Sequence, residues 1–172
     1  MFEKKVKDIM TPIEDYPRIP HSSSIAEALL EFKDYAHKGY RHVLVFDERF
    51  QLVGILSLKD LLRNIEPEFL KTDVSTKFQG PMPTDDGSIA IMWEDAFFED
   101  CKKKMDIPIK EILTPTKIIT ITSDAPVMKA LYLMMREDVN ALPVIEGNVV
   151  VGVIRLLDIV GEILCTCGIK GD

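Results

Sequence analysis

The sequence predicts an α/β (α+β) fold built from two pseudo-twofold-related repeats, each ordered strand, helix, strand, strand, helix, with a partly helical insert between them. The main observation is that segments return in the same order. VKDIMTP at 6–12 returns as IKEILTP at 109–115, and VGILSLKDLL at 53–62 returns as VGVIRLLDIV at 151–160. A second observation is that 47% of the 172 residues are apolar, which is enough to bury a core. Such internal repetition predicts two copies of one structural unit.

A helix is predicted early in each repeat. In the first, Ser24 and Glu27 form the pattern of a capping box, and Gly39 is available to end the helix. In the second, Pro126 suits a first helical turn. Apolar residues at helical spacing give each helix one buried face: Ile25, Ala28, Leu29 and Phe32, then Val127, Ala130, Leu131 and Met134.

Two short apolar runs follow each helix and predict a hairpin. The second hairpin has Gly147-Asn148 at its turn, which is a two-residue hairpin signal. A last helix then starts near Leu58 in the first repeat and near Leu156 in the second. The predicted strands cover residues 42–46, 52–56, 142–145 and 149–154.

An insert at 66–106 separates the first repeat, 1–65, from the second repeat and tail, 107–172. Its first half is rich in turn residues. Its second half has apolar and polar residues at helical spacing, which predicts an amphipathic helix. This helix either packs on the repeats or on a dimer partner, or acts as a lid over a ligand cleft. The residues at that spacing are Trp93, Ala96, Phe97, Asp100, Cys101 and Lys104.

Composition excludes several classes of protein. A formal charge of −7 disfavours nucleic-acid binding, which needs a dense basic surface. No apolar run is long enough for a membrane span, and the charged N-terminus is unlike a signal peptide, so we expect a cytoplasmic protein. The three cysteines suit free thiols in a reducing compartment. No phosphate loop, zinc-protease motif or nucleophile elbow occurs, so we expect no enzyme.

The pattern resembles the cystathionine-β-synthase (CBS) domain, here as the tandem pair called a Bateman module. The resemblance lies in the DIMTP and EILTP openings, the ALPVI strand, the VGI and VGV strands, and the closing aspartates of SLKD and RLLD. It covers about 6–65 and 107–165. It implies two clefts between the repeats, each able to take an adenosine-type ligand such as AMP, ADP, ATP or S-adenosylmethionine. It also implies a homodimer formed through the helical faces.

The first cleft combines residues of both repeats. An aspartate accepts hydrogen bonds from both ribose hydroxyls, and a serine with the adjoining helix N-terminus favours phosphate. Asp60 would hold the ribose, Ser57 a phosphate, and Arg41, His42 and Lys59 further phosphates. The alternative is that Ser57 and Asp60 only cap the last helix. The remaining ligand-binding candidates are Ile55 from the first repeat and Thr114, Ile118 and Val139 from the second.

The second cleft departs from the family pattern. Arg155 stands where serine or threonine is usual, so it either binds a phosphate or fills the cleft and forms a salt bridge with Asp158. Asn140 and Ala141 stand at the positions of Arg41 and His42. The other candidates are Thr11, Pro17 and Tyr40 from the first repeat and Ile154 from the second.

Two hypotheses remain as alternatives to a nucleotide sensor. A separate, unidentified effector protein would read its output, because the pattern contains no effector domain. The main rival is a CBS pair without ligand that serves as a dimerisation or docking surface. A third reading is a thiol-based metal or redox sensor using Cys165 and Cys167, although a reduced terminus is the simpler reading. His21 and His37 lack metal-ligand partners and are predicted to be surface residues.

Overall fold

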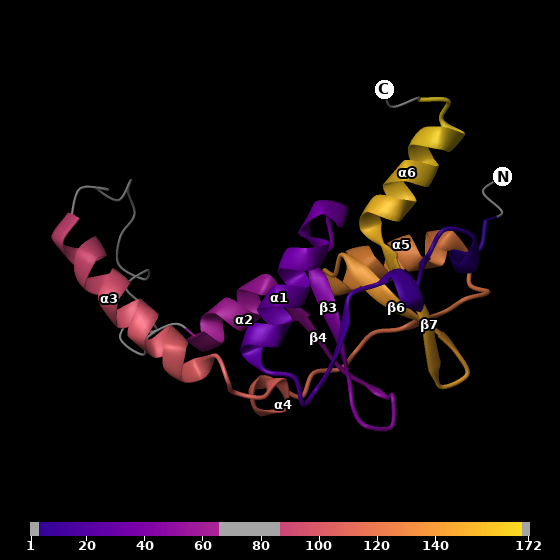
Figure 1. Ribbon diagram of the computed structural model, residues 1–172. Helices are drawn as coiled ribbons and strands as arrows, with labels where there is room; N and C mark the ends of the chain where they lie inside the picture. Colours follow the sequence, from indigo (N-terminus) through magenta and orange to yellow (C-terminus); the bar gives the residue numbers. More distant parts are fainter. Residues whose placement is uncertain (1–3, 66–86, 170–172) are drawn as a thin grey trace.

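The computed structural model describes residues 4–65 and 87–169 and contains two β-sheets with helices packed against them (Figure 1). The predicted order of strand, helix, strand, strand, helix is confirmed in both repeats. The first repeat consists of β2 (Arg18–Pro20), α1 (Ile25–Tyr35), β3 (His42–Phe46), β4 (Leu52–Ser57) and α2 (Leu58–Ile65). The second consists of β5 (Ile121–Thr122), α5 (Val127–Glu137), β6 (Ala141–Glu146), β7 (Val149–Arg155) and α6 (Leu156–Thr166).

Six further elements lie outside this repeated unit. The opening segment of the chain forms a 3₁₀ turn, a two-residue strand and a second 3₁₀ turn, and another 3₁₀ turn follows α1. The insert supplies one long helix, and the opening segment of the second repeat supplies a short one. These elements are η1 (Val6–Asp8), β1 (Thr11–Pro12), η2 (Ile13–Asp15), η3 (Ala36–Lys38), α3 (Gly87–Lys104) and α4 (Ile109–Ile112).

The two sheets share one pairing scheme. In each repeat the first strand pairs in parallel with the second, and the second pairs antiparallel with the third. Both hairpins also shift register at equivalent places, between Val45 and Phe46 and between Val144 and Ile145. Residues 147 and 148 form the two-residue turn that was predicted, since Glu146 pairs with Val149. The second sheet gains a fourth strand, because β1 pairs antiparallel with β7.

The start of α1 has the predicted cap. The Ser24 hydroxyl accepts a hydrogen bond from the Glu27 amide at 3.2 Å, and the Glu27 carboxylate accepts one from the Ser24 amide at 2.8 Å. This reciprocal pair satisfies two amides that have no partner inside the helix. At the other end, η3 continues the turn and Gly39 closes it with a φ of +72°, a conformation that glycine adopts without strain.

The opening segment of each repeat packs into the core of the other repeat. The Val6 amide donates to the Ala125 carbonyl at 2.9 Å, and the fully buried Val6 side chain belongs to the core of the second repeat. Conversely, the Ile109 amide donates to the Ser23 carbonyl at 2.7 Å, and the fully buried Ile109 completes the core of the first repeat. The cores therefore interlock, and each contains one element from the other half of the sequence.

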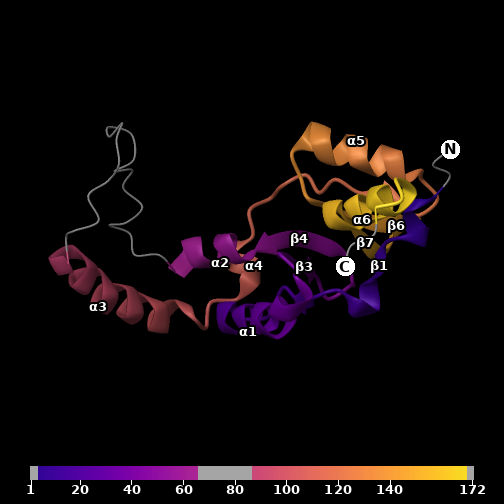
Figure 2. The same ribbon diagram turned by 90° about the horizontal axis from the view of Figure 1, so that it is seen from above.

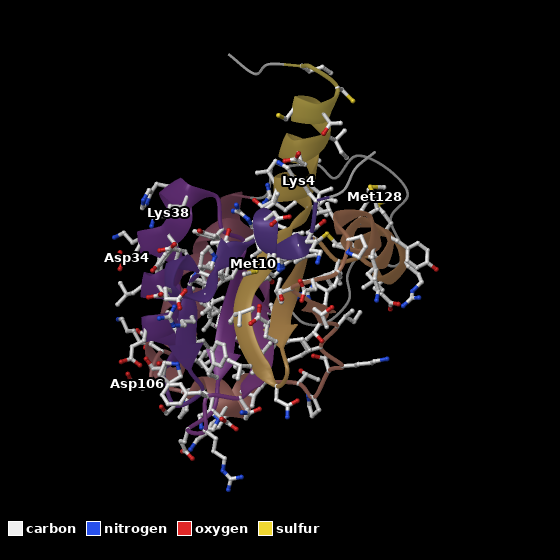
Figure 3. The ribbon with its side chains drawn as sticks, turned by 90° about the vertical axis from the view of Figure 1, so that its right-hand side faces the viewer. Lys4, Met10, Asp34, Lys38, Asp106 and Met128 are labelled. Atoms are coloured by element: carbon white, nitrogen blue, oxygen red, sulfur yellow. The ribbon has the colours of Figure 1, made fainter. Side chains whose placement is uncertain are left out.

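A glycine lies at each point where an opening segment crosses the other repeat. A methyl group added at Gly54 would lie 2.5 Å from Cδ2 of Leu113. One added at the equivalent Gly152 would lie 2.5 Å from the carbonyl oxygen of Thr11 and 2.9 Å from the sulfur of Met10. Figure 3 shows Met10 in front of the strands of the second repeat, with Lys4 at the base of α6. The crossings are close enough that a side chain on either glycine would disturb them.

The predicted insert helix is present as α3 and begins at Gly87, earlier than the spacing from Trp93 indicated. Cys101 is buried in the core of the first repeat, with Phe97 and Met105 packed against it. The start of α3 extends away from the two sheets in Figures 1 and 2. The turn-rich half of the insert falls at 66–86, outside the described residues. In the described ranges, 4–65 and 87–169, no helix is both long and apolar enough to cross a membrane.

Candidate functional site

A cavity of about 270 Å³ lies beside Asp60, where the two repeats meet. The end of β4 and the start of α2 form one wall, and the segment that follows α4 forms the other. The predicted residues Ile55, Asp60 and Thr114 line it together. The other lining residues are Gly54, Leu56, Arg63, Asn64, Ile112, Leu113 and Thr116. The structure thus brings a carboxylate of one repeat next to a threonine of the other.

Asp60 caps α2 through one of its two carboxylate oxygens. Oδ2 accepts from the Ser57 amide at 2.8 Å and from the Ser57 hydroxyl at 2.7 Å, and the Asp60 amide donates to that hydroxyl at 3.1 Å. The other oxygen, Oδ1, lies 3.9 Å from an Arg63 nitrogen, and 43% of the Asp60 side chain is exposed. The capping reading is therefore correct for Oδ2, while Oδ1 keeps lone pairs that can accept further hydrogen bonds.

A smaller apolar cavity of about 100 Å³ adjoins the first, because both are lined by Ile55 and Thr116. It contains the predicted residues Ile118 and Val139, and also Ala141. Lys117, Ile119 and Leu142 complete its lining. Apolar walls next to a carboxylate have the chemistry that a nucleoside requires, with the base between aliphatic side chains and the sugar at the acid.

Arg41 and His42 line a third cavity, of about 300 Å³, together with Asn140, Ala141 and Arg155. Residues predicted for two different clefts therefore share this central cavity. Its other lining residues are Tyr16, Gly39, Leu156, Leu157 and Val160. Arg41, His42 and Arg155 all line this cavity, and each carries or can take up a positive charge. The cavity therefore favours an anion over a cation.

His42 connects the central cavity with the Asp60 site. It pairs with Ser57 across the hairpin. Burial lowers the pKa of His42 below its ordinary value of 6.5, and the charge of Arg41 lowers it further, while Asp60 acts in the opposite direction. The imidazole is therefore neutral at pH 7 and becomes charged more readily when an anion lies beside it.

Arg155 is paired with Asp158, the aspartate of the second predicted cleft. Its guanidinium donates from Nη2 to Oδ1 of Asp158 at 2.6 Å and from Nε to Oδ2 at 3.0 Å, and its amide donates to Oδ2 at 2.9 Å. The guanidinium carbon also lies 5.0 Å from the ring centre of Tyr40. The hydrogen bond to Asp158 is the main cause that raises the pKa of Arg155. Of the two alternatives for Arg155, the structure contains the salt bridge.

The remaining predicted residues are placed as follows. Thr11 pairs with Val153, and Pro17 is buried with its carbonyl accepting from the Leu44 amide. Ile154 is completely buried in the core of the second repeat, so the prediction that it lines a cleft is wrong. Lys59 is exposed on the first turn of α2 and is absent from the lining of the cavities described above.

Several residues at these cavities were not predicted. Tyr16 is almost fully buried beside Arg155, and burial raises its pKa to about 12. Arg63 and Asn64 line the Asp60 cavity one turn along α2, where the i, i+3 and i, i+4 spacing from Asp60 was a usable signal. A further cavity of about 430 Å³ lies between the ends of the hairpins and contains none of the predicted ligand-binding residues.

The histidine and cysteine predictions have mixed outcomes. His37 is exposed as predicted, whereas His21 is half-buried, 3.5 Å from Glu48, because the returning α4 segment covers it. Cys165 and Cys167 are exposed free thiols at the end of α6, and Cys101 is a buried one. The described residues hold no group of three or more histidine, cysteine or acidic side chains suited to a metal.

Comparison with known proteins gives one family. A family model described as CBS domain matches residues 6–67 and 109–165. Among curated protein sequences, none matches the chain. At 13–22% identity, similar solved structures establish the fold of this chain and nothing further.

Three of these structures contain adenosine compounds. CBSX2 in complex with AMP is 18% identical with a TM-score of 0.60, covering 95% of this chain and 98% of that chain. The CBS domain of a bacterial CNNM/CorC family Mg²⁺ transporter in complex with ATP is 18% identical with a TM-score of 0.63, covering 95% and 89%. The CBS domain pair of protein MJ0100, with 5-methylthioadenosine and S-adenosyl-L-methionine, is 22% identical with a TM-score of 0.58, covering 95% and 98%.

Proposed function

The chain belongs to the CBS domain family, and on that premise we propose that it is a regulatory module that senses an adenine nucleotide or a related adenosyl compound. The observation that carries the proposal is that Asp60, which uses only Oδ2 to cap α2, lines a cavity shared with Thr114 of the other repeat. The AMP, ATP and S-adenosylmethionine complexes of similar structures support this class of ligand.

The ligand would span the three adjoining regions in order. The adenine lies between Ile118 and Val139, and the ribose hydroxyls donate to Oδ1 of Asp60. Phosphate groups extend toward Arg41 and His42 in the central cavity. Each additional phosphate meets more positive charge, so we expect nucleotides to bind more tightly than adenosine alone.

The mechanism is a population shift between two orientations of the repeats. A ligand held by Asp60 from one repeat and Thr114 from the other stabilises the orientation in which these residues are close. It can shift the equilibrium only by the difference in its affinity for the two states. A separate effector protein would read the change, and we assign no catalysis to the chain.

A homodimer through the outer helices is also part of the proposal. Met128, Tyr132 and Met135 on α5 are 49%, 60% and 70% exposed, and Leu157 on α6 is 69% exposed. Figure 3 shows Met128 on the outer side of its helix, away from the strands. An exposed apolar surface of this kind favours association of two copies. The free cysteines are consistent with a cytoplasmic location.

Calorimetric titration with AMP, ADP, ATP and S-adenosylmethionine tests the proposal. Asp60→Ala removes a charged acceptor, so we expect the affinity for the best ligand to fall about 10- to 100-fold. Asp158→Ala is the matched control, because Asp158 is already paired with Arg155 and its loss should not lower the affinity. Equal affinity of the parent and the Asp60→Ala variant would refute the assignment. No binding by any of the four compounds would favour the docking module instead.

A further inference from the structure

Arg155 and Ser57 occupy equivalent positions at the ends of β7 and β4, each three residues before the aspartate of its repeat. Both backbone amides donate to Oδ2 of that aspartate, at 2.9 Å from Arg155 and 2.8 Å from Ser57. The side chains then differ. The Ser57 hydroxyl reaches only Oδ2 of Asp60, whereas the Arg155 guanidinium reaches both oxygens of Asp158.

The guanidinium presents to Asp158 the same donor pattern that a ribose would present. A ribose offers two neighbouring O–H groups to one carboxylate, and the fork of Arg155 offers two N–H groups to the two oxygens, at 2.6 and 3.0 Å. The planar cation also lies 5.0 Å from the ring centre of Tyr40, one of the residues predicted for the base side of this cleft. Arg155 thus meets the polar and aromatic partners that a nucleoside would use.

A neutral sugar cannot readily displace this side chain. The Arg155 and Asp158 side chains are only 22% and 13% exposed, so their ion pair is largely shielded from water. A two-point contact in which both partners are charged is stronger than the hydrogen bonds that uncharged ribose hydroxyls make to the same carboxylate. Displacement would also leave the guanidinium half-buried without its partner. By contrast, the Asp60 side chain is 43% exposed.

We infer that Arg155 is a built-in plug of the ribose site in the second cleft, where it holds both oxygens of Asp158, so that each chain binds one nucleotide, in the first cleft. The inference rests on the proposed function, since it concerns the same class of ligand. The two clefts then differ in role: one senses the nucleotide, and in the other the arginine of the protein takes the place of the ribose at Asp158. The residue three positions before the aspartate is serine in one repeat and arginine in the other.

Reciprocal exchange of the two residues provides the test, with calorimetric titration of AMP and ATP as the readout. We expect one site per chain in the parent and two in Arg155→Ser, because serine restores the cap found at Ser57 and frees Oδ1 of Asp158. Ser57→Arg should close the first cleft and leave no site. The double variant should bind one nucleotide again, now lost with Asp158→Ala and retained with Asp60→Ala.

The outcomes separate this inference from the proposed function. One site in both the parent and a folded Arg155→Ser variant would overturn the plug while leaving the nucleotide sensor intact. Two sites in the parent would overturn it as well. A parent without binding and an Arg155→Ser variant with one site would support the plug and refute sensing by the first cleft. Arg155→Thr provides a second variant, and thermal melting of each protein establishes that it is folded.

Discussion

The two crossings between the repeats have the same sequence pattern and different construction. At the first, Thr11 and Pro12 pair with Val153 and Gly152 as strand β1, so backbone hydrogen bonds hold the segment against β7. At the second, Leu113 lies against Gly54 through its side chain, and β4 gains no such strand. One crossing is therefore fixed by the main chain and the other by a movable side chain.

This difference coincides with the difference between the clefts. The cavity beside Asp60 lies at the side-chain crossing and includes both Leu113 and Gly54 in its lining. On the side of the strand crossing, Arg155 holds both carboxylate oxygens of Asp158. The comparison teaches that the half with the side-chain crossing is also the half whose aspartate is bound through only one oxygen in its helix cap, whereas Arg155 holds both oxygens of Asp158 in the other half. Three mutational comparisons test how far this contrast holds.

The largest expected effect comes from removing the side chains that each opening segment buries in the other repeat. Ile109→Ala deletes three fully buried carbon atoms, so we expect a loss of about 2–5 kcal/mol in the free energy of unfolding. Val6→Ala deletes two and should cost less. Urea denaturation measures both, with the exposed neighbour Lys110→Ala as the control. If one repeat of either variant unfolded in a separate transition at lower urea concentration, the inference that the two cores depend on each other would be contradicted.

A smaller effect is expected at the glycines. Gly152→Ala places its methyl group against the Thr11 carbonyl, which is held by strand pairing, so we expect a loss of about 1–3 kcal/mol. Gly54→Ala meets only the end of the Leu113 side chain, which can rotate, and should cost less than about 1 kcal/mol. Thermal and urea unfolding give the order. If Gly54→Ala proved the more costly, the contrast between a fixed and a movable crossing would fail.

The smallest effect concerns pH, because His42 has Ala141 as its counterpart in the second repeat. The folded-state pKa of His42 lies below its ordinary value of 6.5, so the unfolded chain takes up a proton first as the pH falls. The contribution of His42 to the free energy of unfolding is therefore largest above pH 6.5. It decreases as the pH falls below that value, because the unfolded chain is then protonated while the folded His42 is not. His42→Gln should therefore lose less stability than the parent between pH 7 and 5.

Unfolding at a series of pH values measures the effect of His42, and the exposed His37→Gln provides the control. An identical decline with pH in the parent and His42→Gln would show that other groups carry the dependence. Nucleotide binding should have the opposite trend, since a phosphate beside a charged His42 is favoured as the pH falls.

The helices and strands could be predicted from the sequence more fully than the contacts between them. Periodicity and caps located eight of the ten elements of the repeated unit, because they depend on local patterns such as Ser24 with Glu27. The first strand of each repeat, β2 or β5, was predicted only as a member of the order and without residue bounds. The sequence did not predict that the opening segment of each repeat packs into the core of the other repeat. The local pattern that makes Val6 and Ile109 buried residues is the same whichever core receives them, so only the tertiary structure decides between the two.

The site prediction had a similar limit. Asp60 and Thr114 do share a cavity, and Ile118 and Val139 line the adjoining one. Ile154 failed because neighbouring residues of a strand face opposite sides, and Val153 is the residue equivalent to Ile55. For Arg155 the sequence left two partners open, since a long side chain reaches either a phosphate or Asp158, and the choice depends on three-dimensional distances.

The interlocked cores also determine when each repeat can fold during synthesis of the chain. Lys7 and its ion-pair partner Asp124 are 117 residues apart, so the segment around Lys7 is synthesised well before its partner. At about 5–20 residues per second, this delay is on the order of ten seconds. For most of that time the first repeat also lacks Ile109, and the nascent chain has an unfilled core. We expect a ribosome-bound chain cut short before Ile109 to be a client of chaperones rather than a folded half.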